Sequence, residues 1–204
     1  LAAQGVTFSQ GYAANASCAP SRAALMSGRY ATRFGFEFTP TPPGMIPITN
    51  MIGEMQDRPL LPPGVTSSEE STLTYPEMAM PPSEITLAEL IADAGYHTLH
   101  IGKWHLGLEK GTLPHEQGFA ESLLRVGGLY GRLDDPDVIP ARQEFDPIDR
   151  FLWAAPGLSA RFNGGPPFEP PKYSTDYYTA EAAKAIQATK EPPFSCDLEP
   201  EAPH

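Results

Sequence analysis

The sequence predicts an α/β protein, and three stretches of the chain carry this prediction. Residues 83–94 have the spacing of a helix, and residues 96–101 alternate as a strand directly after it. A short helix is expected from residue 18 onward, and another helix between residues 173 and 190 precedes a final strand. Helices that alternate with strands are typical of a sheet covered by helices.

The first helix contains the most informative residues of the chain. Cys18 is followed by Ala-Pro-Ser-Arg, and Gly28 closes the stretch. Pro20 suits the first helical position, where its missing N–H has no partner, and Gly28 suits the C-terminal cap. Cys18 is therefore expected at a helix N-terminus, which favours an anion, with the basic Arg22 one turn along. The alternative is a buried structural thiol or a disulfide with Cys196.

The helix at residues 83–94 has recognisable ends. Thr86 and Glu89 have the spacing of a capping box, which starts a helix, and Gly95 ends it. One apolar face at helical spacing consists of Leu87, Leu90, Ile91 and Ala94.

The strand that follows leads to two candidate functional residues. Gly102 lets the chain turn sharply, so Lys103 and His105 emerge at the C-terminal end of the strand. In open α/β sheets ligands bind at that end. The alternatives are a solvated lysine and a hydrogen-bonded core histidine. His97 and His100 lie within the strand, and we interpret them as packing or surface residues rather than ligands.

The helix between residues 173 and 190 is expected to pack on the sheet. Ser174 and Thr175 are candidates to cap it. Its apolar positions are Tyr178, Ala182, Ala185 and Ile186.

Composition limits the class of protein. The 204 residues suffice for one domain with a core. The net charge of −11 argues against nucleic-acid binding, which needs a basic surface, but a few focused cations can still bind an anionic substrate. The sequence contains no run of 18 apolar residues, so no transmembrane helix is predicted. Two cysteines are too few for a disulfide framework.

Prolines are abundant and concentrate in two stretches. The chain has 24 of them, mostly within residues 40–82 and 134–171. Neither stretch shows sustained periodicity, so both are predicted to be long loops, either at the rim of a pocket or as surface excursions. The acidic pairs Glu69-Glu70 and Asp134-Asp135 follow no buried strand, and we interpret them as solvated.

Two motifs resemble signatures of the type I sulfatases, which belong to the alkaline phosphatase superfamily. Residues 18–29 resemble Cys-x-Pro-Ser-Arg followed by a small-residue helix and Thr/Ser-Gly-Arg. Residues 95–107 resemble Gly-Tyr-x-Thr-x-x-x-Gly-Lys-Trp-His-Leu-Gly. Residues 1–8 are similar to the segment that precedes the cysteine motif in that family. The start of the chain also lacks a basic leader segment, so we expect the chain to begin within the domain.

A third and weaker resemblance lies at the end of the chain. Residues 193–204 are similar to a sulfatase strand that leads into Ala-Pro-His, which would place His204 at the sulfate. In the family this strand is apolar and aromatic. Here it carries the acids Asp197, Glu199 and Glu201 as well as Pro200. Acids and proline fit poorly in a buried central strand, so the strand is either damaged or at an edge, or its sequence is unreliable.

The resemblance implies a fold and a domain organisation. The fold would be part of an alkaline-phosphatase-like sandwich, with a mixed, mostly parallel central sheet and helices on both faces. Residues 1–204 would form part of one catalytic domain that is truncated at both ends, and residues 40–82 and 134–171 would be loop insertions. We expect this chain alone to be inactive.

The resemblance also implies a mechanism. A formylglycine-generating enzyme would convert Cys18 to formylglycine, an aldehyde whose hydrate attacks sulfate esters. Arg22 would stabilise the hydrate, Lys103 would hold a sulfate oxygen, His105 would assist the elimination as a base, and His204 would protonate the leaving oxygen. The divalent cation would be Ca²⁺, with Mg²⁺ as the alternative. Cys18 would ligate it through its formylglycine oxygen, and the other ligands would lie outside this chain.

The resemblance leaves substrate and class partly open. The expected substrate is a sulfated small molecule or a sulfated glycan, and the family is secreted, periplasmic or lysosomal. One alternative is a hydrolase of phosphate or phosphonate monoesters from the same superfamily. The others are a sulfatase-like domain that binds sulfated glycans without turnover and an acidic, proline-rich interaction module.

Overall fold

The computed structural model describes residues 3–40, 74–128, 134–136, 138–139, 149, 152–153, 157–189 and 193–199. This part of the chain forms a four-stranded sheet with the order β3-β2-β1-β4. The strands are β1 (His97–Gly102), β2 (Glu121–Gly127), β3 (Leu158–Phe162) and β4 (Phe194–Glu199). β1 pairs in parallel with both β2 and β4, whereas β3 runs antiparallel to β2. The prediction of a mixed, mostly parallel sheet is confirmed.

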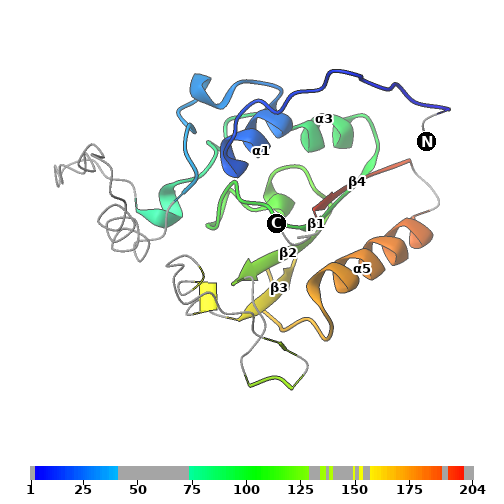
Figure 1. Cartoon of the computed structure of the whole chain (residues 1–204). Coiled ribbons are helices and arrows are strands. Elements are labelled where there is room, and N and C mark those ends of the chain that lie inside the picture. Colours follow the sequence, from blue (N-terminus) through cyan, green and yellow to red (C-terminus); the bar gives the residue numbers. More distant parts are fainter. Residues whose placement is uncertain are drawn as a thin grey trace.

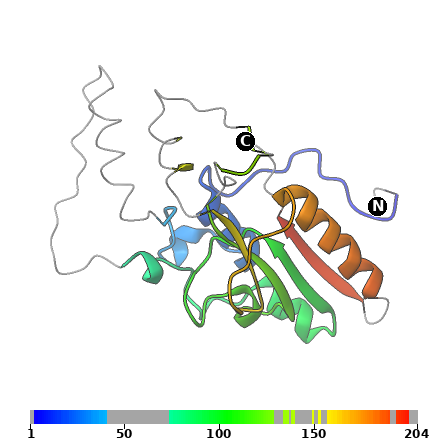
Figure 2. The ribbon, with the colours of Figure 1, turned by 90° about the horizontal axis from the view of Figure 1, so that it is seen from below.

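Helices cover both faces of this sheet, as predicted. Figure 1 shows α1 (Cys18–Ser27) and α3 (Leu87–Asp93) on one face and α5 (Ser174–Ala188) on the other, and Figure 2 shows the same arrangement from below. Within the described residues, three short 3₁₀ helices lie in the connections, at Ala31–Arg33, Tyr75–Glu77 and Pro114–Glu116. No helix in the described part of the chain is long and apolar enough to cross a membrane.

Each face of the sheet has its own apolar core. Successive residues of a strand point to opposite faces, so Leu124 packs with α1 and Trp104 on one side and Leu123 packs with Tyr178 of α5 on the other. α1 contributes small residues, with Ala19 and Ala23 fully buried. Small side chains let this helix pack closely, and it contacts α3 and the 3₁₀ helix at Ala31–Arg33.

Helix α3 begins as the sequence predicts but buries a different face. The Thr86 hydroxyl accepts from the Glu89 backbone N–H at 3.1 Å, and the Glu89 carboxylate accepts from the Thr86 N–H at 2.6 Å, which completes the capping box. Of its apolar residues, Ala88 is buried, whereas Leu87 and Leu90 are 47% and 58% exposed. An apolar face usually marks the side that meets a core, and here the described residues leave that face open.

The C-terminal elements differ from the prediction in three details. The residue before α5 is Tyr173, without a side-chain cap, so the Ser174-Thr175 cap is wrong by one position. Tyr178 is buried as predicted, but Ile186 is 47% exposed. β3 lies inside residues 134–171, which the sequence predicted to have little regular structure. Much of both proline-rich stretches lies outside the described residues, and their role as insertions stays a prediction.

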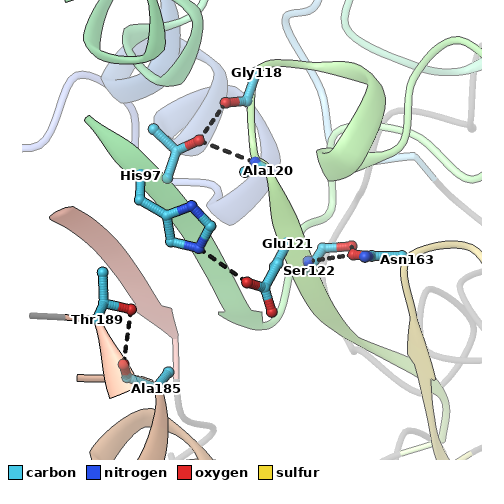
Figure 3. A network of polar contacts seen from close by, with 9 residues as sticks. His97, Gly118, Ala120, Glu121, Ser122, Asn163, Ala185 and Thr189 are labelled. Carbon is cyan, nitrogen blue, oxygen red and sulfur yellow. Dashed lines mark hydrogen bonds and ion pairs between the residues drawn. The ribbon is translucent and has the colours of Figure 1, made fainter. Parts of the chain in front are cut away.

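Polar contacts join β1 to β2 at the start of both strands (Figure 3). His97 Nε2 lies 2.9 Å from Glu121 Oε1. The Thr98 hydroxyl donates to the Gly118 carbonyl at 2.7 Å and accepts from the Ala120 N–H at 3.0 Å. These contacts fix the register in which Gly102 pairs with Leu124. β1 ends at this pair, whereas β2 continues to Gly127, and both strands run toward the same edge of the sheet.

Candidate active site

Cys18 is the first residue of α1 and is exposed. Its Sγ lies 3.7 Å from the Thr39 Oγ1. Ser17, which precedes the helix, makes no side-chain cap, and the first turn holds no acid. Cys18 therefore stands at a helix N-terminus, as predicted, and the first turn has no charge that would oppose an anion. Cys18 and Cys196 are both free thiols, so the alternatives of a disulfide and of a buried structural thiol at position 18 are wrong.

The ends of α1 match the sequence with one shift. Gly28 caps the helix with φ of 64°, in the left-handed region that glycine tolerates. Pro20, predicted at the first helical position, is the third. It still lies in the first turn, where the backbone N–H has no partner within the helix.

Arg22 joins α1 to the C-terminal edge of the sheet. Its Nη1 donates to the Lys103 carbonyl at 3.0 Å, and its Nη2 donates to the Glu199 carboxylate at 2.9 Å. Lys103 follows β1 and Glu199 ends β4. One turn of helix separates Cys18 from Arg22, so the N-terminal half of α1 lies against the strand ends that carry Lys103.

The segment after β1 is fixed on both sides of Lys103. Gly102 has φ of 109°, and a side chain there would overlap the backbone of Glu199. The Lys103 N–H donates to the Glu199 carbonyl at 3.3 Å. Trp104 is buried, and its Nε1 donates to the Thr112 carbonyl at 2.8 Å. The lysine backbone is therefore held at the edge of the sheet where ligands bind in α/β folds.

His105 adopts a strained backbone in a positively charged setting. Its φ of 65° is uncommon for a residue with a side chain and is found at functional sites. Burial, followed by the nearby charges of Lys103, Arg22 and Arg125, lowers the pKa of His105 from 6.5 to about 4. Its buried Nδ1 has no hydrogen-bond partner in the described part of the chain. A neutral imidazole surrounded by three cations suits a site for an anion.

The lowered pKa of His105 predicts a pH dependence. The unfolded chain takes up a proton near pH 6.5, whereas the folded chain does so only near pH 4. Stability should therefore fall as the pH drops from about 6.5 to about 4 and lose no more from this residue below that range. Histidine-labelled NMR, with a His105→Gln spectrum to assign the signal, should show a neutral imidazole at pH 6. A titration midpoint near 6.5 without ligand would contradict the burial and the cation cluster.

The sulfatase family profile matches residues 1–204, the whole chain. The chain belongs to the sulfatase family. It is 34% identical over 125 residues to an arylsulfatase of Hemicentrotus pulcherrimus, across 58% of this chain and 17% of that sulfatase. It is 30% identical over 156 residues to human N-acetylgalactosamine-6-sulfatase, across 74% of this chain and 25% of that enzyme. The chain thus spans about a quarter or less of the curated sulfatases it matches.

Solved structures show a similar fold. Ps i-CgsB in complex with k-i-k-neocarrahexaose matches with a TM-score of 0.60 and 23% identity, across 95% of this chain and 36% of that one. BT4656, in complex with its substrate D-glucosamine-2-N,6-O-disulfate, matches with a TM-score of 0.56 and 21% identity, across 95% and 26% of the two chains. These likenesses support the fold predicted for the described residues.

The remaining sequence predictions concern His204, His100 and the two acidic pairs. His204 lies outside the described residues and stays a prediction. His100 is fully buried, with Nδ1 2.8 Å from Asp197 Oδ2, and packs edge-on against Trp104. It is a packing residue, as interpreted from the sequence. Asp134 and Asp135 are exposed, as predicted, whereas the Glu69-Glu70 pair lies outside the described residues.

Sequence reasoning missed Arg125. This residue follows Leu124, the partner of Gly102 in the parallel ladder, so it lies at the same sheet edge as Lys103. Burial raises the pKa of Tyr75 and the charge of Arg125 opposes that rise, while the same charge adds to the causes that lower the pKa of His105. The sequence signal was weak, since a single arginine near the end of a strand is common. Only the register of β1 and β2 places it beside the motif residues.

The described residues do not supply the ligands for the divalent cation that the family implies. In the described part of the chain, no group of three or more histidine, cysteine, aspartate or glutamate side chains could hold a metal ion. The carboxylate of Glu199 is engaged by Arg22. These residues therefore do not form a calcium or magnesium site by themselves.

Proposed function

We propose that the full-length protein with this chain is a sulfuric ester hydrolase that uses a formylglycine derived from Cys18. The observation that carries the proposal is the bond from Arg22 to the Lys103 carbonyl. It ties the helix that begins at Cys18 to the strand end that bears Lys103 and His105. Two motifs that are about 80 residues apart in the sequence thus meet at one sheet edge.

Cys18 supplies the nucleophile in this proposal. An ordinary thiol has a pKa of about 8.5 and is not a natural nucleophile for sulfate esters. Formylglycine would supply an oxygen nucleophile and covalent catalysis, which divides one hard step into two easier ones. The exposed position of Cys18 at the start of α1 leaves it accessible to a modifying enzyme and to an anionic ester.

The chain's own charged residues would then handle the ester. Lys103 binds a sulfate oxygen, and Arg22, besides stabilising the hydrate, offers its remaining donors to the oxyanion of the ester. Donors fixed by the sheet edge favour charge that develops during reaction. His105 enters the reaction neutral, because burial and the neighbouring cations lower its pKa to about 4. A neutral imidazole can accept a proton during the elimination that releases sulfate. His204 remains the candidate to protonate the leaving oxygen.

The substrate class is proposed from the relatives. An arylsulfatase and an N-acetylgalactosamine-6-sulfatase are among the similar proteins. We propose a sulfate ester of a small molecule or of a glycan. The alternative, a phosphate or phosphonate monoester, would bind the same cations. Matched aryl sulfate and aryl phosphate assays separate the two, because a strong preference for phosphate would move the protein to the phosphoesterase branch.

The acidic residues of the final strand are the sequence feature that favours a non-catalytic, sulfatase-like domain. β4 is nevertheless regular and pairs with β1 over six residues. It lies at the end of the described sheet, and its acids have partners, since Asp197 meets His100 and Glu199 meets Arg22. These partners account for two of the acids in the strand and support the catalytic alternative.

Modification of Cys18 is the direct test of the mechanism. We expect mass spectrometry of peptides that span residues 18–22 to show the aldehyde or its hydrate when the full-length protein is made with a formylglycine-generating enzyme. Cys196 is an internal control, because no proline follows it at the required spacing, and it should remain a thiol. An unmodified Cys18 in a competent host would exclude the proposed nucleophile.

A further inference from the structure

Glu199 brings a negative charge into a cluster of cations. Its carboxylate lies 2.9 Å from Nη2 of Arg22, and the two side chains are only 27% and 21% exposed. Arg22, Lys103 and Arg125 all lie close enough to lower the pKa of His105. An acid in such a place would reduce the attraction for an anionic ester unless it serves another purpose.

The position of this carboxylate is set by the sheet. Glu199 is the last residue of β4 and pairs with Gly102 in the parallel ladder. The backbone of Glu199 approaches Gly102 so closely that any side chain at position 102 would overlap it. The Lys103 N–H bonds to the Glu199 carbonyl. A residue held by a strand is placed more accurately than one on a loop, so the carboxylate has a defined point from which to act.

The two bonds of Arg22 define the plane of its guanidinium. Nη1 donates to the Lys103 carbonyl and Nη2 donates to the Glu199 carboxylate, so the guanidinium is anchored at both terminal nitrogens. An arginine has five N–H donors in a rigid plane. Two are used in these bonds, and anchoring them fixes the direction in which the remaining donors point.

We infer that Glu199 is a positioning residue of the site: with the Lys103 carbonyl, its carboxylate orients the Arg22 guanidinium so that the remaining donors meet the oxyanion of the substrate. The inference rests on the proposed function. Glu199 acts through Arg22 and does not touch the ester. Loss of the carboxylate leaves Arg22 half-buried with one anchor, and even small misplacements of a binding group lower activity strongly.

The test uses Glu199→Gln in the full-length protein made with a formylglycine-generating enzyme. Arg22 itself is left unchanged, because it belongs to the motif that directs modification of Cys18. We expect kcat/KM for an aryl sulfate to fall about 10- to 100-fold. The inhibition constant of inorganic sulfate should rise, because misoriented donors bind the anion less well. Mass spectrometry should show unchanged modification.

Glu84→Gln is the matched control. Glu84 pairs with Arg29, which follows the same helix α1 at its other end, outside the site. Each substitution removes the carboxylate from one ion pair with an arginine in or next to α1. The two variants should therefore lose similar amounts of folding stability. Only Glu199→Gln should change kcat/KM and sulfate inhibition. Glu199→Asp, which keeps the charge, should retain more activity and serves if the glutamine variant folds poorly.

The outcomes separate the possible roles of Glu199. Tighter inhibition by sulfate in Glu199→Gln would mean that the acid only repels anions, and unchanged kinetics would mean that it is structural. A changed calcium requirement with normal sulfate inhibition would make it a metal ligand. Each result overturns the inference. Absence of sulfate-ester cleavage in the parent protein itself would instead refute the proposed function.

Discussion

Replacement of Lys103 with alanine is expected to lower the turnover of a sulfate ester by about 100- to 1000-fold, the usual cost of removing one donor to a developing anion. The residue directly follows β1, between Gly102 and the buried Trp104. Its backbone is bonded to Arg22 and to Glu199, so its placement does not depend on the charged end of its side chain. The loss should therefore appear in catalysis rather than in folding.

His97→Ala is the control for this experiment. His97 lies at the start of the same strand, where it meets the exposed Glu121. Its loss should change turnover very little, because the reaction is expected at the other end of β1. His100 is not an equivalent control, since it is fully buried against Trp104 and Phe119 and its removal would open the core. Steady-state assays of both variants should differ by the full factor. Equal losses would mean that the Gly-Lys-Trp-His sequence is structural.

Local signals were predicted well because they depend on neighbouring residues. The capping box of Thr86 and Glu89, the glycine cap at Gly28 and the turn at Gly102 all appear where the sequence places them. Each requires only residues within about one turn. The pairing of the two motifs was also expected, but through family resemblance rather than through any local rule.

Distant partners could not be predicted. The acids of β4 looked unsuited to a strand, because their partners His100 and Arg22 are 97 and 177 residues away in the sequence. The apolar spacing of Leu87 and Leu90 indicates a face of α3 but not what covers it. Arg125 joins the site only through the register of two strands. Tertiary packing determines these contacts, and the spacing of residues in the sequence carries no information about it.

Gly102→Ala should be the most destabilising single change near the site. The residue has φ of 109°, which side chains rarely adopt, and a methyl group would overlap the carbonyl oxygen of Glu199. Strain at such a backbone costs about 1–3 kcal/mol, and overpacking against a fixed neighbour costs about another 1–3 kcal/mol. The neighbour is strand backbone, which cannot rotate away. We therefore expect β1 and β4 to separate where Arg22, Lys103 and Glu199 meet.

Gly95→Ala separates the two causes. Gly95 also has a positive φ, of 86°, but a methyl group there would meet no atom within 4 Å. It should show the strain alone, about 1–3 kcal/mol, with normal kcat/KM. Gly102→Ala should lose roughly twice as much stability in denaturant titrations, and the fraction that remains folded should cleave sulfate esters poorly. Equal stability losses in the two variants would show that β4 can move away from β1 at little cost. The pairing of β4 with β1 could then not be what holds Glu199 beside Arg22.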